Sequence, residues 1–292
     1  MTASARQPAP DGSASGPLSG LPAVAAPVPD VAALYRSMVE SNRYLPIPKA
    51  EESFVGDGDF RAIGAEFLEL FIRHGGLRRH WNVLDVGCGI GRMAIPLTQY
   101  LSANARYAGV DVDRHGIAWC RRRISKVYPN FAFQRLDYLN PIYNPTGRLF
   151  PHTHPLPFEP GSFDFAIATS VFTHLARWEV KSFLRQLAVI LRPGGRLFAT
   201  FFLLDETASE AMRQGKSRLT FNFPATANVF EAVGLPARSA TAYRRSYVEA
   251  LLAGLGFDLP GGVIRGSWSG APGGVTYQDV IVAEKPALVP GP

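Results

Sequence analysis

A glycine-rich run, VLDVGCGIG, stands where a buried strand would pass into a helix. Its three glycines, Gly87, Gly89 and Gly91, allow a tight turn and let a ligand approach the backbone, beside the free N–H groups of the following helix. A dinucleotide-binding loop of the G-x-G-x-x-G type would need a glycine where Arg92 stands. Asp85, at the end of the strand, would also repel a pyrophosphate. A carboxylate there suits the ammonium group of an amino-acid ligand instead.

Two further acidic residues follow the next two predicted strands. Asp111 ends the strand YAGVD, where a carboxylate can accept hydrogen bonds from both ribose hydroxyls of an adenosine. Asp137 ends the next strand, within RLDY, where its carboxylate could accept the exocyclic N–H of an adenine. Together with Asp85, these acids match the ammonium, ribose and adenine ends of S-adenosylmethionine.

Five motifs occur in an order that resembles the class I methyltransferases, and most of all the bacterial group described as type 11 or type 12. They are VLDVGCGIG, GVDVD, the LD of RLDY, LPFEPGSFDFAIATSVFTHL and LRPGGRLFATFF, and the resemblance covers about residues 59–204. It implies a doubly wound α/β fold with helices on both faces of a mostly parallel, seven-stranded sheet. The implied strand order is 3-2-1-4-5-7-6 with the last strand antiparallel, and S-adenosylmethionine binds at the ends of strands one to four.

The resemblance also assigns cofactor contacts to particular residues. It places Asp85 and the glycine loop at the methionine end, Asp111 at the ribose and Asp137 at the adenine. In the loop, the implied contacts are Gly87, Cys88, Gly89 and Gly91. Val112 is implied to pack on the adenine face, and Thr169 or Ser170 to line the sulfonium side. Tyr138 is a further implied cofactor contact.

One histidine is a candidate for the chemical step. His174 follows the fourth predicted strand, near the expected position of the methyl group. Histidine has an unperturbed pKa of about 6.5 and accepts a proton near neutral pH, so we expect His174 to be the general base for an alcohol; capping a turn or packing in the core is the alternative. Cys88 is expected to fill the turn and not to act as a nucleophile. The pair His152 and His154 lacks a third ligand, so no metal site is predicted.

The methyl acceptor is predicted to be a hydroxyl of a small molecule, such as a glycan or another polar natural product. Enzymes that methylate amino groups of nucleic-acid bases carry an (Asn/Asp/Ser)-Pro-Pro-(Tyr/Phe) run where this chain has TSVF, which argues against a nucleic-acid partner. Three alternatives stay open: N-, S- or C-methylation of a small molecule, methylation of RNA or protein, and a non-enzymatic nucleoside-binding module. The sequence leaves the oligomeric state open.

The elements that must position these residues alternate between short apolar runs and helical patterns. Strands are predicted near 83–88, 107–112, 131–136, 163–170, 196–204, 257–265 and 275–284. Helices are predicted near 59–74, 92–103, 114–127, 177–191 and 244–255. Near-continuous apolar strands between amphipathic helices indicate a mostly parallel sheet that is covered on both faces.

One methyltransferase domain is predicted over residues 31–286, with an N-terminal cap over 31–80. Residues 1–30 are rich in alanine and proline, and residues 287–292 resemble them. Such segments bury too little apolar surface to offset the entropy of ordering, so both are predicted to be disordered tails.

Two stretches, 138–162 and 205–242, are longer than connections between elements need. We expect both to be long loops over the carboxyl ends of the strands, where ligands bind in such sheets. Together with the segment 31–58, which carries Tyr44 and Phe54, they are expected to roof the acceptor pocket.

The composition agrees with a single enzyme domain. The chain has 292 residues, 47% of them hydrophobic, which is enough for one sizeable core. Its 30 basic and 24 acidic residues give a net charge of +6, but only 18% of residues are charged, so the balance indicates no nucleic-acid protein. Two cysteines offer no disulfide framework, and no apolar run approaches the roughly 18 residues of a membrane span. A cytoplasmic protein without a membrane partner is therefore predicted.

Overall fold

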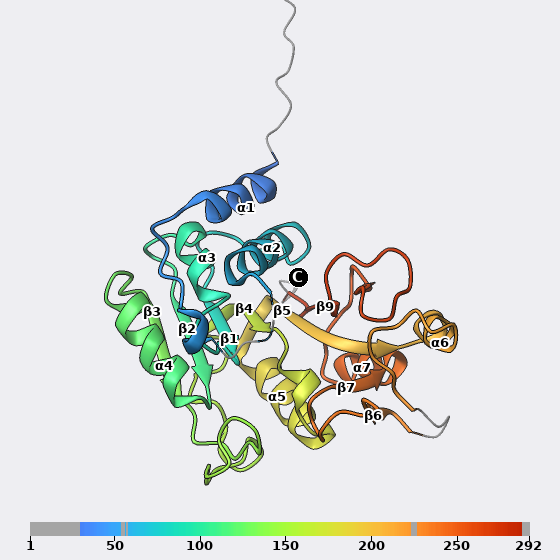
Figure 1. Ribbon diagram of the computed structural model, residues 1–292. Coiled ribbons are helices and arrows are strands. Elements are labelled where there is room, and N and C mark those ends of the chain that lie inside the picture. Colours follow the sequence, from blue (N-terminus) through green and yellow to red (C-terminus); the bar gives the residue numbers. More distant parts are fainter. Residues whose placement is uncertain (1–29, 54–55, 57, 223–226, 288–292) are drawn as a thin grey trace, which may run out of the picture. The chain divides into compact units, whose positions relative to one another are not determined.

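In the computed structural model, the glycine loop follows β1 (Val83–Val86), which lies in the middle of a mixed sheet (Figure 1). The other main strands are β2 (Tyr107–Asp111), β3 (Phe131–Arg135), β4 (Phe163–Ala168), β5 (Leu191–Leu204), β8 (Val263–Ile264) and β9 (Asp279–Glu284). Their pairing gives the order β3-β2-β1-β4-β5-β9-β8, in which β1 to β5 are parallel and β9 is antiparallel to β5. The predicted strand order and the antiparallel last strand are confirmed.

Helices cover both faces of this sheet because parallel neighbours need a crossover connection. They are α1 (Val31–Ser41), α2 (Phe60–Arg73), α3 (Ala94–Tyr100), α4 (Arg114–Cys120), α5 (Arg177–Ile190) and α7 (Arg245–Ala253), with short turns at η1 (Ala50–Glu52), η2 (Arg121–Ser125) and η3 (Phe172–His174). One apolar cluster joins α2, α3 and α4 to Val83, and a second joins α5 and α7 to the adjacent Leu84. Alternate side chains of β1 therefore enter opposite layers, and Figure 1 shows α2 and α5 on opposite sides of the strands.

The 205–242 insertion is not the long loop that the sequence predicts. It contains α6 (Glu206–Arg213) and β6 (Val229–Glu231) and leads into β7 (Thr241–Arg244). β7 pairs in parallel with the end of β5 and antiparallel with β6. The prediction was wrong here because strands this short have no readable period, and they are stabilised by packing around the buried Trp268.

The structure describes residues 30–53, 56, 58–222 and 227–287. The predicted disordered tails, 1–30 and 287–292, lie outside the described residues except for residues 30 and 287. The described residues from Val31 onward form one compact unit. Within the described residues, no helix combines the length and the apolar character that crossing a membrane requires.

Candidate active site

The loop after β1 turns sharply because three of its residues have positive φ angles. Gly87, Gly89 and Gly91 have φ of 77°, 52° and 84°, a region that other residues enter only at a cost. At Gly87 a side chain would also collide, because its Cβ would lie 2.3 Å from Cγ2 of Val171. The Gly87 N–H donates to the carbonyl oxygen of Val110 at 2.8 Å. The loop is thereby fixed at the adjoining ends of β1 and β2.

Asp111, the last residue of β2, connects this loop to the next turn. One carboxylate oxygen accepts a hydrogen bond from the Gly89 N–H and the other from the Asp113 N–H, both at 2.7 Å. Burial raises the pKa of Asp111 to about 6, and these N–H groups oppose that rise. The group is therefore ionised at neutral pH, and each oxygen keeps a lone pair for a ligand.

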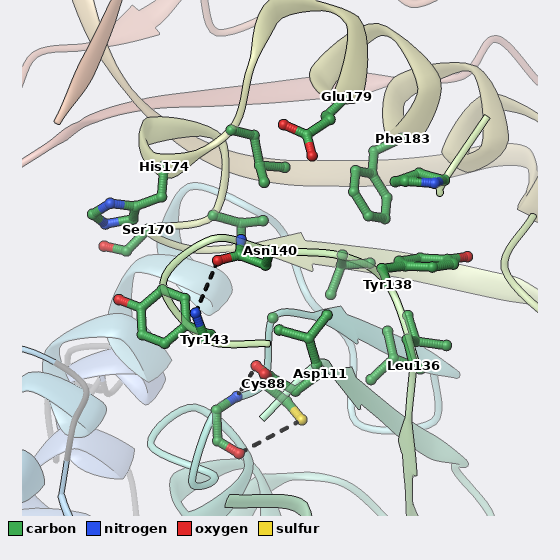
Figure 2. A pocket seen from close by; sticks show the side chains of 18 of the residues that line it. Cys88, Asp111, Leu136, Tyr138, Asn140, Tyr143, Ser170, His174, Glu179 and Phe183 are labelled. Carbon is green, nitrogen blue, oxygen red and sulfur yellow. Dashed lines mark hydrogen bonds between the residues drawn. The ribbon is translucent and has the colours of Figure 1, made fainter. Parts of the chain in front are cut away.

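The carboxyl ends of β1, β2 and β4, with the chain that follows β3, surround a pocket beside this carboxylate (Figure 2). The predicted site residues that line it are Gly87, Cys88, Gly89, Asp111, Val112, Tyr138, Thr169, Ser170 and His174. Figure 2 shows Cys88 and Asp111 across the pocket from Glu179 and Phe183. It also shows Tyr138 at the end of the pocket away from His174, so the expected adenine and acceptor regions lie apart.

Asp85 lies inside the sheet and is not among the residues that line the pocket. One carboxylate oxygen accepts a hydrogen bond from the Tyr107 hydroxyl at 2.5 Å, and the other is buried without a hydrogen-bond partner. Burial raises the pKa of Asp85 to about 7, because an isolated charge is poorly solvated there. Its predicted role toward an ammonium group stays a prediction, and no direct contact is available from this position.

Asp137 and Gly91 also lie outside the lining. The Asp137 carboxylate accepts a hydrogen bond from Arg148 Nε at 2.9 Å and lies 3.6 Å from Arg135 Nη2. These arginines lower the pKa of Asp137 together with a hydrogen bond from Asn144. Contact between Asp137 and an adenine stays a prediction.

Of the three predicted roof segments, 138–162 supplies lining residues. Five of them line the pocket: Tyr138, Leu139, Asn140, Tyr143 and Pro151. The side-chain oxygen of Asn140 accepts hydrogen bonds from two backbone N–H groups, those of Ile142 and Tyr143, each at 3.0 Å. This local turn holds Tyr143 at the pocket wall, where Figure 2 shows it.

The other two roof segments, 31–58 and 205–242, contribute no described residue to the lining. Tyr44, which follows α1, is 97% exposed, and Phe54 lies outside the described residues. The prediction that Tyr44 covers the pocket was therefore wrong. The 205–242 insertion does not line the pocket, but the carbonyl oxygen of its Arg238 contacts the lining residue His174.

Arg92 is a pocket residue that the sequence reasoning used only to exclude a dinucleotide loop. It lines the pocket directly after the glycine loop, and its Nε is buried without a hydrogen-bond partner. Burial lowers the pKa of this guanidinium. A cation with an unused donor beside the loop fits the carboxylate of an amino-acid ligand. A signal was present in the sequence, since an arginine in such a loop is a natural anion ligand.

His174 reaches the pocket from η3. Its Nδ1 lies 3.1 Å from the backbone carbonyl oxygen of Arg238, which can only accept a hydrogen bond, so Nδ1 carries the proton. Burial lowers the pKa of His174, and hydrogen bonds to the backbone of Arg238 and Ser239 oppose this. The imidazole is therefore neutral at pH 7, and Nε2 is the ring nitrogen that is left to accept a proton.

Glu179 brings a buried carboxylate to the same wall. Its side chain is 3% exposed and lies 3.3 Å from Nη1 of Arg238, and it accepts the Ala176 N–H at 2.7 Å. Burial raises the pKa of Glu179 against the effects of both partners. Sequence reasoning missed this residue because a glutamate in the first turn of a helix usually forms a capping box. Phe183, one turn further along α5, lines the pocket as well.

The cysteines show no sign of reactivity. Cys88 and Cys120 are free and buried, and burial raises the pKa of Cys88 well above its usual range. This agrees with a thiol that fills the turn. The described residues contain no cluster of three side chains suited to a metal ion.

A sheet of this order, with a glycine loop after its first strand and an acid after its second, defines the class I methyltransferases that depend on S-adenosylmethionine. Residues 83–195 match the family described as "Methyltransferase domain". Those residues therefore form a methyltransferase domain, and S-adenosylmethionine is the cofactor of that domain.

Two curated relatives illustrate the range of similar proteins. A phthiotriol/phenolphthiotriol dimycocerosates methyltransferase of Mycobacterium ulcerans is 36% identical over 41% of this chain and 36% of its own length. An O-methyltransferase of Aspergillus nomiae is 28% identical over 44% of this chain and 49% of its own length. The chain thus spans less than half the length of both relatives.

A solved structure supports the fold beyond the matched family region. The crystal structure of a protein from Pyrococcus horikoshii OT3 superposes with a TM-score of 0.54 at 17% identity, over 81% of this chain and 96% of that chain. At this identity the likeness concerns the fold alone.

Proposed function

We propose that the protein transfers the methyl group of S-adenosylmethionine to a hydroxyl of a small molecule, with His174 as the general base. One observation carries this proposal: the same pocket contains the glycine loop with Asp111 and, at the other side, the imidazole of His174, whose Nδ1 lies 3.1 Å from the carbonyl oxygen of Arg238. One relative with a matching segment is named an O-methyltransferase, which is consistent with a hydroxyl acceptor. The proposed acceptor class is a glycan or another polar natural product.

The described residues fit the cofactor at both of its polar ends. Asp111 has free lone pairs for the ribose hydroxyls, and Arg92 has an unused, buried donor for the carboxylate. On the other side of the ribose, Val112 and Leu136 provide apolar surface for the adenine. When bound, S-adenosylmethionine supplies a methyl group already activated by the sulfonium.

The acceptor side then needs alignment, exclusion of water and one proton acceptor. Apolar side chains of Val171 and Leu175, which lie close to His174 in the chain, line the pocket and limit the access of water. Nε2 of His174 accepts the hydroxyl proton, a contribution worth about 10²–10⁴-fold in rate. The Nδ1 hydrogen bond to Arg238 stabilises the resulting imidazolium.

The proposal is tested by incubating the protein with methyl-labelled S-adenosylmethionine and a lysate of the source cells, followed by mass spectrometry of the small molecules, the RNA and the protein. We expect one or a few labelled products whose label sits on oxygen. His174→Ala should lower turnover by about 10²–10⁴-fold with nearly unchanged cofactor affinity. Label on nitrogen, sulfur, carbon, RNA or protein would replace the proposed acceptor. Cofactor binding without turnover on any acceptor would instead indicate a nucleoside-binding module.

A further inference from the structure

The turn that carries His174 is held from behind by the chain segment 238–243. The hydroxyl of Tyr243, which is fully buried, lies 2.9 Å from the carbonyl oxygen of Leu175 and 3.2 Å from that of Phe172. These two carbonyls flank His174 in the chain. The insertion and β7 therefore fix the backbone of η3 without lining the pocket themselves.

Arg238 provides the second attachment, and it does so in an unusual backbone conformation. Its φ is 64°, and among the described residues only one other non-glycine, Ser170, has a positive φ. The conformation presents the carbonyl oxygen of Arg238 to His174 Nδ1 at 3.1 Å, while the Arg238 N–H donates to Glu231 Oε2 at 3.2 Å. A non-glycine residue in this region costs about 1 kcal/mol or more, so surrounding contacts must hold it there.

The side chain of Arg238 supplies such a contact. Its guanidinium Nη1 lies 3.3 Å from Glu179 Oε2, and that carboxylate is 3% exposed. An ion pair with a buried partner is screened little by solvent, so it anchors the residue more firmly than a surface pair would. The backbone of Arg238 thus contacts His174, and its side chain contacts Glu179. Both of these partners line the pocket.

We propose that Arg238 is a positioning residue of the methyl transfer: anchored on Glu179, its left-handed backbone holds the proton of His174 on Nδ1 and leaves Nε2 unprotonated. The assignment rests on the proposed function, in which Nε2 is the base. It also gives the 205–242 insertion, which lies outside the matched family region, a role in the reaction.

Three substitutions separate the backbone of Arg238 from its side chain. Arg238→Gly keeps a positive φ accessible and removes the guanidinium, and Arg238→Lys keeps the positive charge. Arg238→Val is β-branched and strongly disfavours this backbone region, so the carbonyl should turn away from His174. Arg213→Val on α6, an exposed arginine of the same insertion, is the matched control.

The primary measurement is the ¹⁵N spectrum of labelled histidines, with the His174 signals identified by loss in His174→Ala. We expect the Nδ1–H tautomer in the unsubstituted protein, Arg238→Gly, Arg238→Lys and Arg213→Val, and its loss in Arg238→Val. With an acceptor in hand, Arg238→Val should also lower turnover at least about 10-fold, towards the effect of losing the base. Binding of S-adenosylhomocysteine shows whether each variant is folded; if Arg238→Val is not, Arg238→Ala takes its place.

An Nε2–H tautomer in the unsubstituted protein would overturn the assignment, as would an unchanged Nδ1–H tautomer in a folded Arg238→Val. Loss of the tautomer in Arg238→Gly as complete as in Arg238→Val would overturn the backbone explanation. These spectra need no methyl acceptor. They therefore test Arg238 even if His174 proves not to be the base, which the turnover of His174→Ala decides separately.

Discussion

The carboxylate of Asp111 holds the glycine loop and faces the expected ribose at the same time. Asp111→Ala removes charge-assisted hydrogen bonds, which are worth about 1.5–3 kcal/mol, so affinity for S-adenosylhomocysteine should fall about 10- to 100-fold. Asp137→Ala is the comparison, because its carboxylate already pairs with Arg148 and should matter less. Titration calorimetry measures both. Equal affinities of Asp111→Ala and the unsubstituted protein would show that the ribose is held elsewhere.

The buried carboxyl of Asp85 should make stability depend on pH. Burial raises its pKa from 3.8 to about 7, so the folded protein holds this proton more tightly than the unfolded chain does. The stabilisation is complete below pH 3.8 and is lost as the pH rises through about 7. Asp85→Asn cannot ionise and should escape this loss, gaining about 2 kcal/mol relative to the unsubstituted protein between pH 5.5 and 8.

Urea unfolding at the two pH values measures this difference. Asp111 has a raised pKa as well, but it is present in both proteins, so the comparison isolates Asp85. Parallel pH dependences of the two unfolding free energies would mean that Asp85 is not buried as a titrating group.

At the scale of elements, the sequence could predict the features that are marked by residues adjacent in the chain, and not those that depend on tertiary packing. The loop after β1 and the acid at the end of β2 could be predicted because each follows an apolar strand directly in the chain. β6 could not, because three residues carry no period. Glu179 and Arg238 could not be paired in advance either: one resembles an ordinary helix cap, and the other comes from an insertion whose path only tertiary packing decides.

The turn between β1 and α3 should tolerate no side chain at Gly87. An alanine at this position would have to adopt a positive φ. Its Cβ would also collide with Val171, a residue that lines the pocket. Gly161→Ala is a matched control, because Gly161 has φ of 64° but its nearest atoms would lie 3.9 Å from the added Cβ. The control should lose about 1 kcal/mol of unfolding free energy and keep its cofactor affinity.

Gly87→Ala should lose more unfolding free energy than Gly161→Ala, because Val171 must move by more than a few tenths of an ångström. It should also bind S-adenosylhomocysteine at least about 10-fold more weakly, because Val171 lines the pocket. Chemical unfolding and calorimetry give the two numbers. If both variants behave alike, the loop is more adaptable than its close contact with Val171 indicates.

At the scale of the whole molecule, the pocket joins distant parts of the chain. Ser170, at the end of β4, has φ of 56°, and its hydroxyl donates to Gln278 Oε1 at 3.2 Å, just before β9. The hydroxyl of Thr200 in β5 donates to the same oxygen at 2.6 Å. The expected sulfonium side of the site is thus fixed by contacts among residues next to β4, in β5 and next to β9, so ligand binding and global stability should be coupled.

Binding of S-adenosylhomocysteine to this site should therefore raise the melting temperature of the chain. A ligand at about 100 times its dissociation constant that binds only the folded state adds roughly 2.7 kcal/mol to the unfolding free energy. For a domain of this size that corresponds to about 5–10 °C. NAD⁺ shares the adenosine but carries a pyrophosphate, and the loop has Arg92 where a dinucleotide-binding loop needs a glycine, so NAD⁺ should shift the melting temperature little. Differential scanning calorimetry with both ligands, and with Asp111→Ala as a weakened site, gives the comparison. Equal shifts for both ligands would point to a generic nucleotide site, and no shift with S-adenosylhomocysteine in a folded sample would remove the cofactor from this pocket.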